Sequence, residues 1–295
     1  MDKKGRFIFD KRPAKDKELN RLIKLSQLYE EDMKKLFNEF KEFNFKRIID
    51  IGAGTGHTTV LLKKIFPKAE VTYCDISKDL SEYARKLSED EGVEVHFIQE
   101  DILKCDNISG KYDFVFSRFA LKHIFNPILA VKNMVSLLNE GGIIQLVDKD
   151  VSANIWFPRF PLYKTDYMKA LNKYNQGQNR GGDPTIGRKL SYLLSQFGVK
   201  KIKVRANGRN LIEDNNKTYR DILVEVYENL LPEMISKGYI TEEESNKDIE
   251  NFKNFLHKKS NLAIVFDFII TGVKTNGAEY NEDRDVSTQY DCRDE

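Results

Sequence analysis

The sequence of 295 residues predicts an α/β fold, in which helices cover both faces of a mostly parallel sheet. Two observations predict it. Five short apolar runs lie between residues 47 and 147, and helical patterns separate most of them. The first run leads directly into glycines at positions 52, 54 and 56, and an apolar helix face follows. A strand, a Gly-rich turn and a helix in this order present backbone N–H groups to a nucleotide-like ligand.

The individual elements have recognisable start and stop signals. The five predicted strands of the sheet occupy residues 47–51, 71–75, 93–98, 112–117 and 143–147. Ser77 is placed to cap the helix after the second strand, and Gly92 to end it. Asn126-Pro127 starts the helix after the fourth strand, and Gly141-Gly142 ends it. Two later strands are predicted at residues 199–204 and 262–272.

The spacing of the glycines distinguishes between two nucleotide cofactors. A dinucleotide-binding turn reads Gly-x-Gly-x-x-Gly, and this chain has His57 where that pattern needs the last Gly. The spacing from Asp50 to Gly56, Asp-x-Gly-x-Gly-x-Gly, instead resembles motif I of the class I S-adenosylmethionine (SAM)-dependent methyltransferases. Asp75 ends the second strand, where a carboxylate can bind the two ribose hydroxyls of either NAD or SAM. A nicotinamide cofactor therefore stays the alternative.

The resemblance to this family implies SAM as cofactor, S-adenosylhomocysteine as product, and a set of binding residues. In the family an acid after the third strand binds the adenine amino group and the next apolar residue lies against the ring, a pattern that Asp101 and Ile102 match. Ser117 and Arg118 follow the fourth strand beside the expected cofactor, Arg118 through its backbone. The expected cofactor-binding residues are Arg21, Asp50, Gly52, Ala53, Gly54, Gly56, Asp75, Ile76, Asp101, Ile102, Ser117 and Arg118.

The family also implies a Rossmann-like, doubly wound sheet of seven strands, whose last strand runs antiparallel beside the fifth. The expected parts are lid helices at 1–43, a SAM-dependent methyltransferase domain at 44–275 with helical cap insertions at about 151–182 and 211–260, and a disordered acidic tail at 276–295. In related enzymes an Arg-Leu pair on the first helix, like Arg21-Leu22, reaches the methionine carboxylate of SAM. A solvated Arg21 is the alternative.

A second segment carries an independent resemblance. Residues 181–190 read Gly-Gly-Asp-Pro-Thr-Ile-Gly-Arg-Lys-Leu, and Asp183 is placed to cap the helix that they begin. This segment is similar to one in a subgroup of bacterial and archaeal methyltransferases, many of them associated with the modification of small molecules or natural products.

The absence of certain motifs disfavours three subclasses of methyltransferase. After the fourth strand it reads Ser117-Arg-Phe-Ala, without the Asn/Asp-Pro-Pro-Tyr/Phe motif of enzymes that methylate adenine or glutamine amino groups. No cysteine follows the fourth or fifth strand, as methylation of pyrimidine carbon 5 would require. Ser117 stands where metal-dependent catechol-type enzymes place a metal-binding Asp. These three subclasses are disfavoured, and no metal site is predicted.

Candidates for substrate handling lie at the carboxyl ends of the fourth and fifth strands, where open α/β sheets bind ligands. His123, Asp148 and Asp150 are the candidate catalytic residues, the acids as bases or as partners of a substrate amine. Packing for His123 and a solvated loop for the acids are the alternatives. Aromatic residues in the first insertion suggest a cover over the cleft, with Trp156, Tyr163 and Tyr167 as candidate substrate contacts. A satellite core is the equal alternative.

Composition constrains the setting. The net charge of +2 arises from mixed signs and gives no argument for nucleic acid. The three cysteines lack metal-like spacing and suit a reducing cytoplasm. No apolar run approaches the ~18 residues of a membrane span, and the first residues are too polar for a signal peptide. We therefore expect a cytoplasmic protein without a membrane partner.

The sequence favours a SAM-dependent methyltransferase that acts on an oxygen or nitrogen of a small molecule or short peptide. An RNA or protein methyltransferase is the nearest rival, and it is disfavoured because no compact basic patch with interleaved aromatic residues is visible. A SAM-binding partner protein without catalysis is the rival from another class. The acceptor, the atom methylated and the choice between monomer and homodimer stay open.

Overall fold

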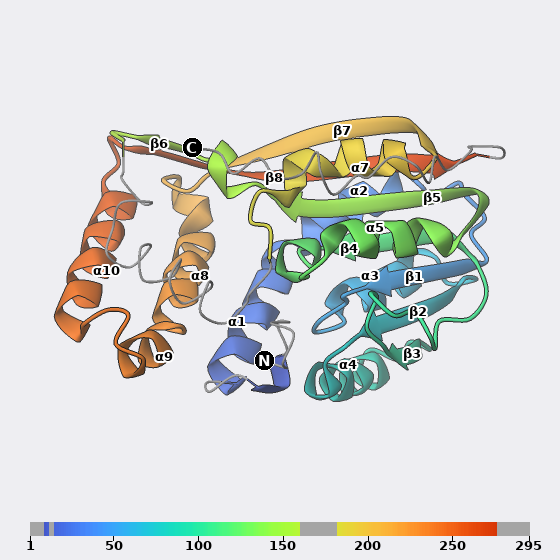
Figure 1. The fold of residues 1–295 in the computed structure, drawn as a ribbon, viewed down its shortest axis with the longest axis horizontal. Helices are drawn as coiled ribbons and strands as arrows, with labels where there is room; N and C mark the ends of the chain where they lie inside the picture. Colours follow the sequence, from blue (N-terminus) through green and yellow to red (C-terminus); the bar gives the residue numbers. More distant parts are fainter. Residues whose placement is uncertain (1–8, 12–14, 160–181, 276–295) are drawn as a thin grey trace.

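The computed structural model describes residues 9–11, 15–159 and 182–275. Its centre is one mixed sheet in the order β3-β2-β1-β4-β5-β8-β6, with β7 also paired to β8 (Figure 1). The strands are β1 (Arg47–Ile51), β2 (Glu70–Asp75), β3 (His96–Gln99), β4 (Tyr112–Arg118), β5 (Leu138–Lys149), β6 (Ile155–Phe157), β7 (Val199–Asn210) and β8 (Leu262–Lys274).

The predicted topology is confirmed. Strands β1 to β5 pair in parallel, and β8 lies antiparallel between β5 and β7. The described sheet has eight strands and not seven, because the short β6 pairs with the start of β8. The predicted start of β5 was wrong. Gly141 and Gly142 lie inside β5 where its pairing with β4 shifts register, and the preceding helix ends at Ser136.

Helices cover both faces of the sheet. The helices of the described residues are α1 (Lys15–Leu28), α2 (Glu30–Asn38), α3 (His57–Ile65), α4 (Lys78–Asp90), α5 (Pro127–Ser136), α7 (Leu190–Gln196), α8 (Lys217–Glu228), α9 (Leu231–Ser236) and α10 (Glu242–His257). The predicted N-caps Ser77 and Asn126 are present, and Thr241 caps α10 in the same way, since each accepts a hydrogen bond from a backbone N–H in the first turn. Among these helices none is long and apolar enough to cross a membrane.

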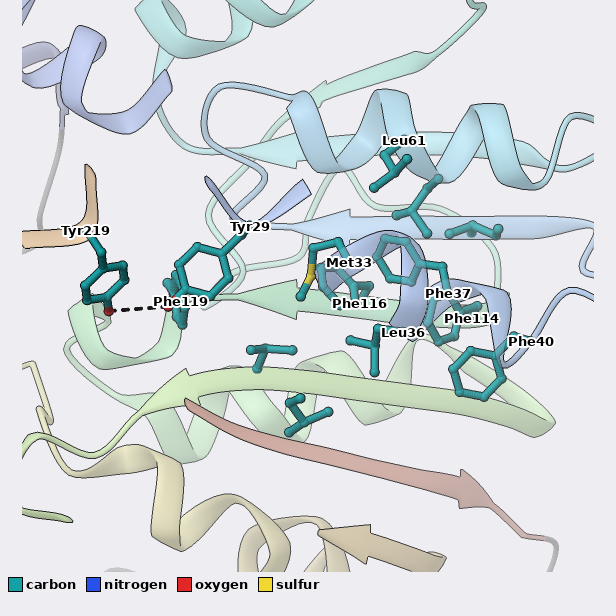
Figure 2. Close-up of a cluster of buried hydrophobic side chains, with 14 of the residues drawn as sticks. Tyr29, Met33, Leu36, Phe37, Phe40, Leu61, Phe114, Phe116, Phe119 and Tyr219 are labelled. Atoms are coloured by element: carbon teal, nitrogen blue, oxygen red, sulfur yellow. Dashed lines mark hydrogen bonds between the residues drawn. The ribbon is translucent and has the colours of Figure 1, made fainter. Parts of the chain in front are cut away.

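The expected lid divides into two parts with different roles. The predicted helix is broken at Tyr29, which separates α1 from α2. Helix α2 packs on the sheet, where the Phe37 ring lies 5.0 Å from the ring of Phe116 (Figure 2). Met33, Leu36 and Phe37 are buried in the main core. Helix α2 is therefore a core helix, and only α1 stays a candidate lid.

Helix α1 is joined to the second insertion. Lys24 of α1 forms an ion pair with Glu225 of α8 at 2.6 Å. Figure 1 shows α8, α9 and α10 gathered at one end of the sheet, with α1 on their inner side. On the other side, Ser26 of α1 lies 3.2 Å from Thr55 of the Gly-rich turn, measured between the hydroxyl oxygens. The α1 helix thus bridges the helical insertion and the Gly-rich turn.

Candidate functional site

The Gly-rich turn has the backbone that the motif predicts. Gly52, Gly54 and Gly56 all have φ between 58° and 77°, in the left-handed region that other residues avoid. A Cβ at Gly52 would lie 2.5 Å from Ala120 Cβ, and one at Gly56 would lie 2.6 Å from Ala84 Cβ. A Cβ at Gly54 would meet no atom within 4 Å. Two glycines therefore permit close packing, and the third leaves open space above the turn.

Asp75 joins this turn to the end of β2. Its carboxylate accepts hydrogen bonds from the N–H of Gly54 at 2.8 Å and from the N–H of Ser77 at 2.9 Å. Burial raises the pKa of Asp75, although these backbone N–H groups oppose that rise. Each carboxylate oxygen keeps a second lone pair for a further donor. The geometry therefore leaves Asp75 able to accept bonds from a ribose.

The expected adenine residues lie next to Asp75. The N–H of Glu100 donates to the backbone carbonyl of Asp75 at 3.1 Å, which brings the ends of β2 and β3 together. Asp101 follows and accepts a hydrogen bond from the N–H of Leu103 at 3.0 Å. Ile102 is buried, and Ile76 is half-buried. The structure thus places these four predicted cofactor residues at one edge of the sheet.

Asp50 faces the start of α3. Its buried carboxylate accepts a hydrogen bond from the Thr59 hydroxyl at 2.7 Å. Burial raises the pKa of Asp50 to about 7, while the bond from Thr59 and the charge of Arg118 oppose the rise. Asp50 therefore anchors the helix that follows the Gly-rich turn. Within the turn, the N–H of Ala53 donates to the backbone carbonyl of Cys74 at 3.2 Å.

The end of β4 lies against the end of β1. The Ser117 hydroxyl is buried and donates to the backbone carbonyl of Ile51 at 2.8 Å. The next side chain, Arg118, donates from Nη2 to the Thr58 hydroxyl at 3.3 Å. Its Nε and Nη1 atoms are shielded from solvent and have no hydrogen-bond partner in the described part of the chain. Burial lowers the pKa of Arg118.

The surroundings of Asp150 do not favour the catalytic role expected for it. This carboxylate is fully buried, forms an ion pair with Arg188, and accepts hydrogen bonds from the N–H groups of Ser152 and Ala153. An acid held by a guanidinium and by the first turn of a helix is a structural group and not a free base.

The ion pair between Asp150 and Arg188 gives a structural reason for the Gly-rich sequence of residues 181–190. A Cβ at Gly182 would lie 2.4 Å from the Lys122 carbonyl oxygen, and one at Gly187 would lie 2.9 Å from the Lys149 carbonyl oxygen. The glycines let this segment lie directly against the chain after β4 and at the end of β5. Arg188 then reaches Asp150. In the part that is described, the segment braces the ends of these two strands.

Asp148 and His123 have different surroundings. Asp148 is buried and accepts hydrogen bonds from the N–H groups of Lys122 at 3.1 Å and Lys149 at 2.8 Å. Burial raises the pKa of Asp148, and the charge of Lys122 opposes the rise. His123 ends the 3₁₀ turn Leu121–His123, and its side chain is exposed. The catalytic roles of both residues stay predictions.

A buried polar cluster was not predicted from the sequence. The Lys149 cluster consists of Tyr29, Lys149, Tyr219 and Asp267. The Lys149 ammonium donates to Asp267 at 2.5 Å and to the Tyr219 hydroxyl at 2.6 Å, and the Tyr29 hydroxyl donates to Asp267 at 2.6 Å. Burial alone would lower the pKa of Lys149, but Asp267 and Tyr219 raise it above its ordinary value. Figure 2 shows Tyr29 and Tyr219 facing each other beside Phe119.

Two further predictions concern Arg21 and Trp156. The Arg21 guanidinium is bidentate to the buried Glu18, with both N–O distances 2.8 Å. Its role at the cofactor carboxylate stays a prediction. The Trp156 ring packs 6.1 Å from the ring of Phe252 and 6.0 Å from that of Phe255 in α10. Trp156 is therefore part of a core under the helical insertion, which favours the alternative of a satellite core, and its role as a substrate contact stays a prediction. Tyr163, Tyr167 and the tail at 276–295 lie outside the described residues.

Known proteins share this sequence pattern and this fold. Residues 48–142 match the family described as "Methyltransferase domain". Demethylmenaquinone methyltransferase of Thermus thermophilus is 30% identical over 103 residues, which cover 35% of this chain and 47% of that protein. The enzyme of the same name from Staphylococcus haemolyticus is 24% identical over 170 residues, covering 54% of this chain and 71% of that protein.

The similarity to solved structures is one of fold. The YcgJ protein from Bacillus subtilis superposes with a TM-score of 0.54 at 19% identity and covers 84% of this chain and 100% of that one. The chain spans about half the length of the Thermus relative, 47%. The matched residues 48–142 run from β1 into β5 and contain the Gly-rich turn, Asp75 and Asp101. By this match residues 48–142 carry a methyltransferase domain, and the sheet order agrees with the one expected from the resemblance to class I SAM-dependent methyltransferases.

Proposed function

We propose that this chain transfers the methyl group of SAM to an oxygen or nitrogen atom of a small molecule or short peptide. The observation that carries the proposal is the joint arrangement of the Gly-rich turn and Asp75. Their hydrogen bond fixes the turn against the end of β2, and Gly54 leaves space beside it. This arrangement fits the ribose and methionine parts of SAM, with Asp101 and Ile102 at the adenine end.

The cofactor would supply a methyl group that its sulfonium already activates. The protein then needs to position the acceptor, exclude water and manage a proton. The ends of β4 and β5 are the place for the acceptor, since open α/β sheets bind ligands at that edge. The Lys149 cluster lies there and includes Tyr219 of α8, and an ion pair between Lys24 and Glu225 joins α8 to α1. We propose that α1 covers this edge when ligands are bound.

Proton removal has one described candidate at the end of β5. Asp148 is buried and has a raised pKa, a state that suits a group that accepts a proton from an amine or a hydroxyl. Both of its oxygens already accept backbone N–H bonds, so its part in catalysis would be through the remaining lone pairs. Asp150 is not proposed, because Arg188 holds it.

The proposal is tested with methyl-labelled SAM and fractionated cell extract. Label should enter the small-molecule or peptide fraction, and S-adenosylhomocysteine should form in equal amount. Label in RNA or large protein would support the rival methyltransferases. Binding of S-adenosylhomocysteine without any incorporation would support the partner protein that does not catalyse. Stabilisation by NADH in place of S-adenosylhomocysteine would overturn the cofactor assignment.

A further inference from the structure

Three cationic side chains surround one aromatic ring at the ends of β4 and β5. The Phe119 ring centroid lies 5.2 Å from Arg118 Cζ, 4.8 Å from Lys122 Nζ and 4.6 Å from Lys149 Nζ. The Tyr29 ring meets the Phe119 ring edge-on at 5.1 Å. Attraction to an aromatic face contributes only about 0.5–2 kcal/mol for each cation. It does not by itself explain why three cations gather around one ring.

Among the described residues, only one of these three cations forms an ion pair with an acid, although Asp50 and Asp148 act on Arg118 and Lys122 from a greater distance. Lys149 is paired with Asp267 at 2.5 Å. Lys122 forms no ion pair within the described ranges, and its bond to Asp148 is donated by its backbone N–H and not by its ammonium group. Burial lowers the pKa of Lys122 to about 8. Arg118 uses one nitrogen for Thr58, and its other two are buried without a partner among the described residues.

Unpaired buried charges are costly, and proteins normally neutralise them with a partner. A guanidinium has a planar fork of donors that matches a carboxylate or a phosphate. Arg118 presents two donor nitrogens without acceptors among the described residues, and Lys122 adds a second positive charge near the same ring. The unused donors are therefore complementary to an anion.

The position of these cations favours the acceptor as the source of that anion. Strand β1 separates β2 from β4 in the sheet order. The cations lie at β4 and β5, on the opposite side of the Gly-rich turn from Asp75, which ends β2. A methyl acceptor has to approach from this side, since Asp75 and Asp101 occupy the other one.

We propose that Arg118 and Lys122 bind an anionic group, a carboxylate or a phosphate, of the methyl acceptor. The proposal rests on the proposed function, because it names the acceptor class of the same site. The acceptor is therefore an acid, and Lys149 adds positive potential while Asp267 neutralises most of its charge.

Calorimetry on the complex with S-adenosylhomocysteine tests the site directly. Succinate and inorganic phosphate serve as probes at constant ionic strength, with chloride as the reference. The wild-type complex should bind at least one probe saturably. Arg118→Gln and Lys122→Gln should each weaken that binding about tenfold or more, as expected for a charged hydrogen bond. Lys68→Gln, which changes an exposed lysine elsewhere, should leave it unchanged.

The competing anion is the carboxylate of the cofactor itself. 5′-Methylthioadenosine lacks that carboxylate. If Arg118→Gln weakens the binding of S-adenosylhomocysteine but not that of 5′-methylthioadenosine, Arg118 binds the cofactor and the proposal is overturned. Absence of binding by both probes also overturns it. Failure of the wild type to bind S-adenosylhomocysteine would instead refute the proposed function, and probe binding to the free protein would still report the anion site.

Labelled SAM and extract then test the acceptor class. Acceptor activity should be retained by an anion-exchange resin. Loss of the activity after phosphatase treatment identifies a phosphate, and its survival identifies a carboxylate. Acceptor activity found only in the unretained fraction would overturn the proposal.

Discussion

The Lys149 cluster makes a strong prediction about stability. Lys149 and Asp267 form a close ion pair whose side chains are only 16% and 8% exposed. Removing one partner of a buried pair typically costs ~3–5 kcal/mol, because the other charge stays buried without compensation. In Lys149→Met the remaining Asp267 keeps the hydrogen bond from Tyr29 at 2.6 Å. We therefore expect the lower part of that range, about 3 kcal/mol, in the free energy of unfolding.

A double-mutant cycle separates the pair from its surroundings. Asp267→Asn alone leaves the Lys149 charge unpaired and should also be destabilising. The double variant Lys149→Met/Asp267→Asn has no unpaired charge, so its loss should be smaller than the sum of the two single losses by about 2 kcal/mol. Urea unfolding followed by circular dichroism measures all four proteins. Additive losses within about 0.5 kcal/mol would refute the reasoning.

Two further predictions concern the Gly-rich turn. Gly52→Ala forces a left-handed φ of 68° and places a Cβ 2.5 Å from Ala120 Cβ, whereas Gly92→Ala has a similar φ of 64° with no atom within 4 Å. Both substitutions should lower the free energy of unfolding, and Gly52→Ala should lower it by ~1–3 kcal/mol more because of overpacking. Equal losses of the two variants in urea unfolding would contradict the close packing. Burial raises the pKa of Asp50 from 3.8 to about 7, so the folded state holds this proton more tightly and the stability contributed by Asp50 is lost as pH rises through that interval. Asp50→Asn should therefore gain stability relative to the wild type between about pH 4 and pH 7, and parallel curves of unfolding free energy against pH would oppose this.

Local features of the fold could be predicted from the sequence because neighbouring residues determine them. The turn at Gly52–Gly56 and the helix cap at Ser77 each depend on a short stretch of chain, and the structure contains them as expected. The start of β5 could not be predicted, since Gly141-Gly142 usually ends a helix and here lies where β5 shifts register against β4.

The candidate site could be predicted only where strand ends determine it. The positions of Asp75 and Asp101 could be predicted because each follows a strand of the sheet, and the structure brings the ends of these two strands together. The Lys149 cluster could not be found this way, because its members come from four segments that are distant in the sequence. Alternation along β5 places Asp148 and Lys149 on opposite sides, but the residues that Lys149 meets depend on which segments cover its side.

Binding of S-adenosylhomocysteine to the wild type and to Asp75→Ala is the most direct measurement of the cofactor site. A carboxylate that accepts the ribose hydroxyls should contribute about 1.5–3 kcal/mol, so calorimetry should show binding to the wild type and at least ~10-fold weaker binding to the variant. Circular dichroism must show that the variant stays folded, because Asp75 also accepts bonds from Gly54 and Ser77. Equal affinity in the two folded proteins, or binding of NADH in place of S-adenosylhomocysteine, would contradict a SAM site at this turn.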